Sequence, residues 1–177
     1  MGTTYTKDDT STSLRAGYKM VSSGRPPFII YTHTYNRSYM KFSITDPPFT
    51  LDQIDSVVLK VRCTNIIGAG GNIRLRSDIN TDNWGADLDA TAGDYNSTDT
   101  EVEDTISITS TGEHEFDVDK NNLNLNGLTY FRLSYLSTSG ISTLDFGSQD
   151  HGTSAYRPQL IVTYTTASGF SQAVVFG

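Results

Sequence analysis

Short segments in which apolar residues occupy every second position recur along this chain, and this alternation restricts its fold more than any other feature. In residues 38–44, SYMKFSI, the apolar residues Met40, Phe42 and Ile44 fall on one side of an extended chain. The same period of two recurs in residues 56–64, 72–79, 105–109, 114–118, 129–137, 142–148 and 159–166. This is the period of a β-strand with one buried face, and helical periodicity is almost absent. The sequence therefore predicts an all-β fold, an antiparallel β-sandwich that is jelly-roll-like.

The residues between these segments predict how some of them connect. A Thr-Gly step at 111–112 separates residues 105–109 from residues 114–118, which is a spacing typical of a β-hairpin. We therefore expect these two segments to pair with each other. Near the C-terminus, Pro158 favours an extended conformation at Arg157, so the preceding loop is expected to form a corner that feeds the last alternating segment.

A chain of 177 residues fits one domain that is large enough to bury a core. We expect a single β-sandwich domain over residues 1–167, followed by an apolar C-terminal strand or tail over residues 168–177. The apolar residues of this tail are candidates for assembly contacts: Phe170, Val174, Val175 and Phe176. Such a segment can add a strand to the sheet edge of a neighbouring subunit or form a strand in its own sheet, and both alternatives stay open.

The charge and cysteine content exclude several kinds of partner and cross-link. A net charge of -7 argues against a nucleic-acid partner, because binding a phosphate backbone requires a basic patch. Cys63 is the only cysteine, so no internal disulfide is expected, and its place in an alternating segment predicts a core position. The N-terminal residues 1–13 contain no apolar segment of a secretory signal, and we expect no membrane insertion.

Residue types that hydrolases use occur together in one short loop, at Asp150, His151 and Ser154. A catalytic triad is built from separate segments that surround a shared substrate, so this proximity in sequence favours turn chemistry over catalysis. The other histidines, His33 and His114, lie in different segments without the spacing of a zinc site. We expect no catalytic residues, and the chain is not expected to be an enzyme.

Three features are candidates for ligand binding. Trp84 lies in a long polar insert, residues 80–104, where it could stack on a sugar ring or fold back as a lid. Tyr31, Tyr35 and Tyr39 could form an aromatic strip for the same purpose. Oxygen ligands of the kind that Ca²⁺ prefers are dense at the start of the insert: Asp78, Asn80, Asp82, Asp87 and Asp89. Calcium is therefore a possible cofactor, with a solvated acidic loop as the alternative.

Several motifs resemble DNRLRE-type β-sandwich domains, which are related to carbohydrate-binding modules found beside alginate lyases. SYMKFSI, a connector and DSVVLKVRCT look like the opening of that family, and HEFDVDK and TYFRLSYLS look like two later strands. The closing block, LDFGSQDHGTSAYRPQLIVTY, is its most specific part, although Gln149 replaces the usual acid. The similarity covers about residues 36–165. It implies a non-catalytic sandwich on an extracellular or surface protein, with a structural corner from Ser148 to Pro158.

Two functions follow as expectations. The first is a non-enzymatic structural protein of a virion or surface assembly, such as a decoration, cement or fibre-type protein of a bacteriophage. It would act through contacts with copies of itself, as a homo-oligomer, and with other structural proteins, on a virion or an extracellular surface. The second is a carbohydrate-binding module that recognises a polysaccharide, with or without the assistance of calcium.

Overall fold

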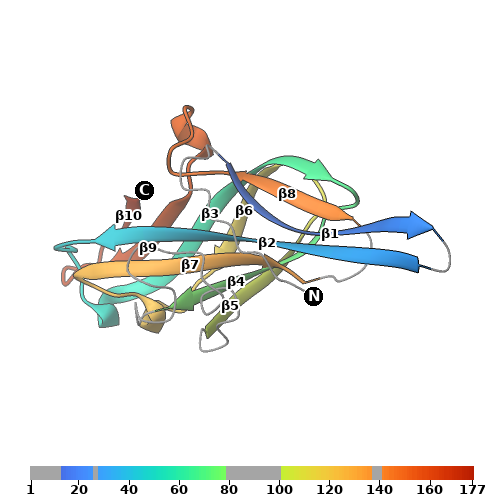
Figure 1. Cartoon of the computed structure of the whole chain (residues 1–177). Coiled ribbons are helices and arrows are strands. Elements are labelled where there is room, and N and C mark those ends of the chain that lie inside the picture. Colours follow the sequence, from blue (N-terminus) through green and yellow to red (C-terminus); the bar gives the residue numbers. More distant parts are fainter. Residues whose placement is uncertain (1–12, 26–27, 79–100, 137–140) are drawn as a thin grey trace.

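The computed structural model describes residues 13–25, 28–78, 101–136 and 141–177, which form a jelly-roll-like antiparallel β-sandwich (Figure 1). The predicted all-β fold is confirmed, and the described residues contain no α-helix. The strands are β1 Ser13–Arg25, β2 Phe28–Ile44, β3 Ile54–Ile67, β4 Gly71–Asp78, β5 Glu101–Ile108, β6 Gly112–Asp117, β7 Gly127–Tyr135, β8 Ser142–Gly147, β9 Gln159–Thr165 and β10 Ser171–Phe176. Short 3₁₀ turns are η1 Leu51–Gln53, η2 Lys120–Asn122 and η3 Ser154–Tyr156.

The strands form two facing sheets that share one long strand. The first sheet has the order β10-β9-β3-β8-β1, with β6 on the other side of β3. The second has the order β2-β7-β4-β5. Residues 28–36 of β2 pair with β1, and residues 37–44 pair with β7. The chain therefore passes from one sheet to the other within β2.

The core lies between the two sheets and follows the predicted alternation. In β9, Leu160, Val162 and Tyr164 are buried, as the pattern in residues 159–166 predicts. Phe42 and Phe131 meet edge to face across the β2–β7 pair, with ring centroids 5.9 Å apart. Cys63 is 1% exposed, which confirms its predicted core position.

One predicted pairing is wrong. β5 pairs with β4 in the second sheet and β6 pairs with β3 in the first, so the two do not form a hairpin. Ile108 at the end of β5 and Phe116 in β6 are both fully buried, each from its own sheet. The intervening Gly112 adopts φ +134°, and the chain turns from one layer to the other there. The Thr-Gly step alone predicts a hairpin, but the apolar residues of both strands are buried only when each strand joins its own sheet.

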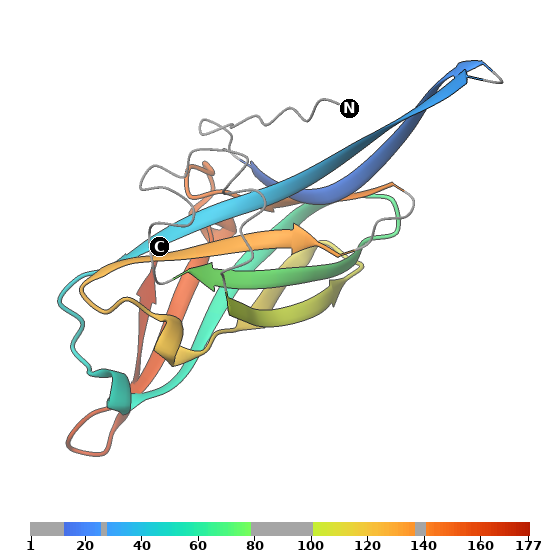
Figure 2. The ribbon, with the colours of Figure 1, turned by 60° about the horizontal axis from the view of Figure 1, so that its bottom comes forward.

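The first strand was not predicted, because the sequence of residues 13–25 lacks regular alternation, and it pairs with the first half of β2. Their register runs from Gly17 opposite Asn36 to Arg25 opposite Phe28. We call these paired segments, residues 17–25 and 28–36, the ribbon. The ribbon extends away from the rest of the sandwich (Figure 2).

Candidate interaction surfaces

The loop that contains Asp150, His151 and Ser154 is held by its own backbone. The backbone N–H of His151 donates to the carbonyl of Ser148, and the hydroxyl of Ser148 accepts from the N–H of Asp150. The Nδ1 of His151 accepts a hydrogen bond from the N–H of Thr153 at 3.1 Å. Ser154 begins the η3 turn. The three hydrolase-like residues therefore occupy consecutive turns of the corner that precedes β9.

Aromatic stacking fixes this corner against β3. The ring of Tyr156 packs on His151 with centroids 4.9 Å apart, and the guanidinium of Arg62 lies 4.5 Å from the Tyr156 ring centroid. Gly147 makes the close approach possible, because a Cβ there would lie 2.0 Å from the carbonyl oxygen of Tyr156. Arg157 is extended, with φ -72° and ψ 143°, as its position before proline predicts.

The C-terminal segment forms the edge strand β10 of its own sheet. The turn that leads into it closes with a hydrogen bond from the N–H of Thr166 to the carbonyl of Phe170, and Gly169 adopts φ +82°. Val174 and Phe176 are partly buried against the core. Phe170 is 69% exposed and Val175 is 54% exposed. Of the four apolar residues proposed for assembly, these two therefore remain available to a partner.

An apolar row crosses the outer face of the sheet beside this edge. Val175 stands opposite Ile161 in β9, and Ile161 stands opposite Val58 in β3. We call Val58, Ile161, Phe170 and Val175, together with the free edge of β10, the edge patch. Residues 166–177 contain no Asp, Glu, Lys, Arg or Pro. The charges and prolines that usually protect a sheet edge from pairing are therefore missing here.

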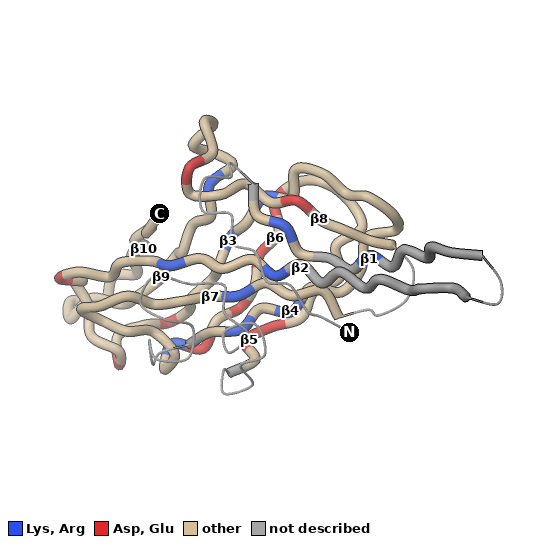
Figure 3. The backbone as a smooth tube through the Cα atoms, in the orientation of Figure 1, with Lys and Arg blue, Asp and Glu red and all other residues tan. Residues whose placement is uncertain are grey.

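Basic residues gather on the outer face of the second sheet, where β2, β7 and β4 lie side by side (Figure 3). Tyr39 stands opposite Arg132, which stands opposite Arg76 in β4. One pair further along, Arg37 and Arg74 both stand opposite Ser134. We call this set the arginine face: Arg37, Tyr39, Arg74, Arg76 and Arg132.

The arginines of this face affect one another. Burial lowers the pKa of the Arg132 guanidinium, and the nearby charges of Arg37 and Arg76 lower it further, whereas the charge interaction and hydrogen bond with Tyr39 raise it. The Nε of Arg74 is buried, and no described residue accepts a hydrogen bond from it. Closely spaced cations with a buried donor favour an anionic group nearby.

The sequence anticipated only part of this face. Alternation in residues 72–79 and 129–137 places Arg74, Arg76 and Arg132 opposite the core side of their segments. Which strands become neighbours depends on the pairing of β7 with both β2 and β4, and no local signal contains that information.

Most of the predicted ligand-binding residues lie outside the described part of the structure. These are Asn80, Asp82, Trp84, Asp87 and Asp89. Asp78 ends β4 and Tyr31 and Tyr35 belong to the ribbon, but the side chains of these three are also outside the described part. Tyr39 alone of the tyrosine strip is placed, on the arginine face. Among the described residues, no group of three His, Cys, Asp or Glu side chains could hold a metal ion.

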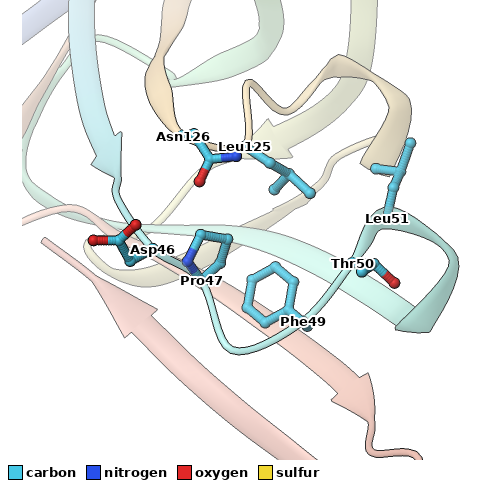
Figure 4. Close-up of a pocket in the computed structure, with 7 residues that line it drawn as sticks. All are labelled: Asp46, Pro47, Phe49, Thr50, Leu51, Leu125 and Asn126. Carbon is cyan, nitrogen blue, oxygen red and sulfur yellow. The ribbon is translucent and has the colours of Figure 1, made fainter.

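An open hollow of about 410 Å³ lies where the connector between β2 and β3 meets the loop before β7 (Figure 4). Pro47, Phe49 and Leu125 supply much of its apolar lining. Phe49 is 5% exposed and packs on Tyr164 with ring centroids 4.8 Å apart. Asp46 is the one charged residue of the lining. Thr50 and Asn126 are its other polar lining residues, so the hollow is only partly apolar.

In comparisons with known proteins, the chain matches no family model and no curated protein. No helix in the described ranges is both long enough and apolar enough to cross a membrane.

Proposed function

We propose that this protein is a non-enzymatic structural β-sandwich of a virion or surface assembly, and that copies of it join through the edge patch. The proposal is carried by one combination: the edge strand β10 has no charged residue or proline, Val175 on it is exposed, and so is Phe170 directly before it. An edge of this kind is a template for pairing with another chain.

Two further observations support this proposal. The closing block resembles DNRLRE-type sandwiches, and this resemblance supports the virion or surface setting and the contacts with other structural proteins. Both stay predictions. The absence of enzymatic activity is supported by the corner loop, where the Nδ1 of His151 accepts a backbone hydrogen bond from Thr153. That nitrogen is then occupied in holding the turn.

The test is to replace Val175 by Lys and to measure the mass of the particles by analytical ultracentrifugation. The unchanged protein should form particles heavier than the 19.4 kDa chain. Val175→Lys should weaken the association about 100-fold or more, because a charge buried without a partner costs roughly 3 kcal/mol or more.

The matched control is Ile67→Lys, which introduces the same charge at another exposed apolar residue, 48% exposed and outside the edge patch. This variant should associate as the unchanged protein does. A Val175→Lys protein that associates normally, or an unchanged protein that is a monomer at every concentration, would refute assembly through the edge patch.

The arginine face favours a second candidate function, the binding of a polysaccharide. Tyr39 and Arg76 are partly exposed there, and arginines pair readily with carboxylate or sulfate groups. Arg132 stands between them in the register but is itself buried, 3% exposed. We infer that, under this alternative, the ligand is an acidic polysaccharide rather than a neutral one.

Affinity electrophoresis in gels that contain either an acidic or a neutral polysaccharide tests this alternative. The acidic gel should retard the protein, and the double variant Arg74→Gln, Arg76→Gln should lose the retardation. The control Lys60→Gln, which removes a cation from the other sheet, should be retarded normally. Retardation that survives the double substitution would contradict the alternative. Repeating the run with a calcium chelator tests the proposed role of Ca²⁺.

A further inference from the structure

The ribbon presents two long free edges of backbone. β8 pairs only with residues 13–18 of β1, and β7 pairs only with residues 37–44 of β2. The outer edge of residues 19–25 and that of residues 28–36 therefore have no strand partner among the described residues. A two-stranded hairpin by itself is marginally stable in water. The backbone edges of the ribbon are therefore ones that a strand of another sheet can complete by hydrogen bonding.

The two strands of the ribbon differ in charge. Residues 28–36, FIIYTHTYN, contain no Asp, Glu, Lys, Arg or Pro. Residues 17–25 contain Lys19 and Arg25 and no acid, whereas the whole chain has a net charge of -7. A second copy of the chain is therefore electrostatically favourable as a partner for the ribbon. Of the two free edges, that of residues 28–36 is the one without charged residues or proline to hinder pairing.

The free edges of the sandwich also differ in charge. At one end of the strand order, Glu103 and Asp104 of β5 accept hydrogen bonds from the N–H groups of Asp119 and Asp117, which ties this edge to that of β6. At the other end, β10 has no charged residue and no second strand partner among the described residues. β10 is therefore the edge that best matches the uncharged strand of the ribbon.

We propose that residues 28–36 of one copy pair with the free edge of β10 in a second copy, so that a continuous sheet runs through both. This inference rests on the proposed function, because it names what the edge patch binds. The two surfaces are different, so the contact is head to tail and builds a closed ring or an open fibre.

The first test removes the ribbon. Residues 18–35 are replaced by Asn-Gly, which forms a tight turn between Gly17 and Asn36, a pair already in register. The sandwich strands keep nearly all their partners, since β7 pairs with the retained residues 37–44 and β8 loses only the pair of Tyr18 with Ser142. Circular dichroism checks the fold, and ultracentrifugation should show a single chain at concentrations where the unchanged protein is assembled.

The second test locates the contact and does not depend on that variant. Proteins with Thr32→Cys and Ala173→Cys are mixed and treated with a short bismaleimide, while the native Cys63, 1% exposed, stays unreactive. The mixture should give a cross-linked dimer that either protein alone gives only weakly. Thr32→Cys mixed with Ser107→Cys, on the exposed face of β5, is the matched control and should give little product.

The outcomes separate this inference from the proposed function. Full assembly without the ribbon, or cross-linking to β5 in place of β10, overturns the ribbon contact even if Val175→Lys still prevents association. If the unchanged protein is a monomer throughout, the proposed function and the ribbon contact both fail.

Discussion

At the scale of single residues, one ion pair anchors the start of the chain to the sandwich. The guanidinium of Arg15 donates to both oxygens of the Asp145 carboxylate, at 2.6 and 3.0 Å, and the amide of Asn65 donates to one of them at 3.1 Å. The Asp145 side chain is only 10% exposed. Burial acts to raise the pKa of Asp145, but the hydrogen bonds from Arg15 and Asn65 and the charge of Arg15 outweigh it, so the pKa is lowered.

This lowered pKa predicts a pH dependence of stability. A carboxyl group whose pKa is lower in the folded state contributes stability above its unfolded pKa of about 3.9 and loses it as the pH falls through the folded value. Asp145→Asn should therefore lower the free energy of unfolding by about 1–2 kcal/mol at neutral pH, a figure kept small because Arg15 is half exposed.

Urea unfolding at a series of pH values measures this effect. The difference between the unchanged protein and Asp145→Asn should shrink as the solution becomes more acidic. Asp52→Asn, at an exposed position in η1, should leave the curve unchanged. A difference that stays constant down to about pH 2 would show that the ion pair does not contribute in this way.

At the scale of elements, acidic side chains join the two sheets where β5 and β6 approach. The carboxylate of Glu103 accepts hydrogen bonds from the backbone N–H of Asp119 at 2.7 Å and from the amide of Asn122 at 2.8 Å, and it also bonds to the hydroxyl of Ser77. Asp104 accepts from the N–H of Asp117 at 3.1 Å. Side chains thus take the place of the hairpin pairing that the sequence predicted.

Glu103→Ala should loosen this junction. The N–H of Asp119 and the amide of Asn122 would lose their acceptor, at a cost of about 1–3 kcal/mol in the free energy of unfolding. Hydrogen exchange measured by NMR should become faster at the Asp119 amide and stay unchanged at Asp117, whose acceptor is Asp104. Glu115→Ala, exposed on β6, is the control, and equal effects at both amides would count against this bridging role.

At the scale of the whole molecule, alternation predicted the strands that bury one face and failed for the others. The segments around Phe42, Val61 and Leu160 repeat apolar residues at every second position, and all three lie in the core. β1 is the exception, because much of its length pairs with β2 outside the sandwich and needs no buried face. Its inner end is held by Arg15 and Asp145, residues separated by 130 positions, which no local pattern can reveal.

The candidate surfaces were likewise only partly predictable from the sequence. Phe170 and Val175 stand out in the sequence as apolar residues in an uncharged tail, so the edge patch was partly foreseen. Val58 and Ile161 join it only through the register of β10, β9 and β3. The arginine face likewise depends on three strands from distant parts of the chain.

The sequence by itself determined the secondary structure and the inward face of most strands, because side chains alternate along a strand and water separates apolar from polar positions. It also determined that residues 148–158 form a corner, since Pro158 restricts Arg157 locally. The tertiary structure decided which strands are neighbours, that β5 and β6 belong to different sheets, and that the ribbon and β10 keep edges without a strand partner in the described part of the chain. Pairing between distant strands is settled only when the whole core packs at once, since many registers satisfy the same alternation.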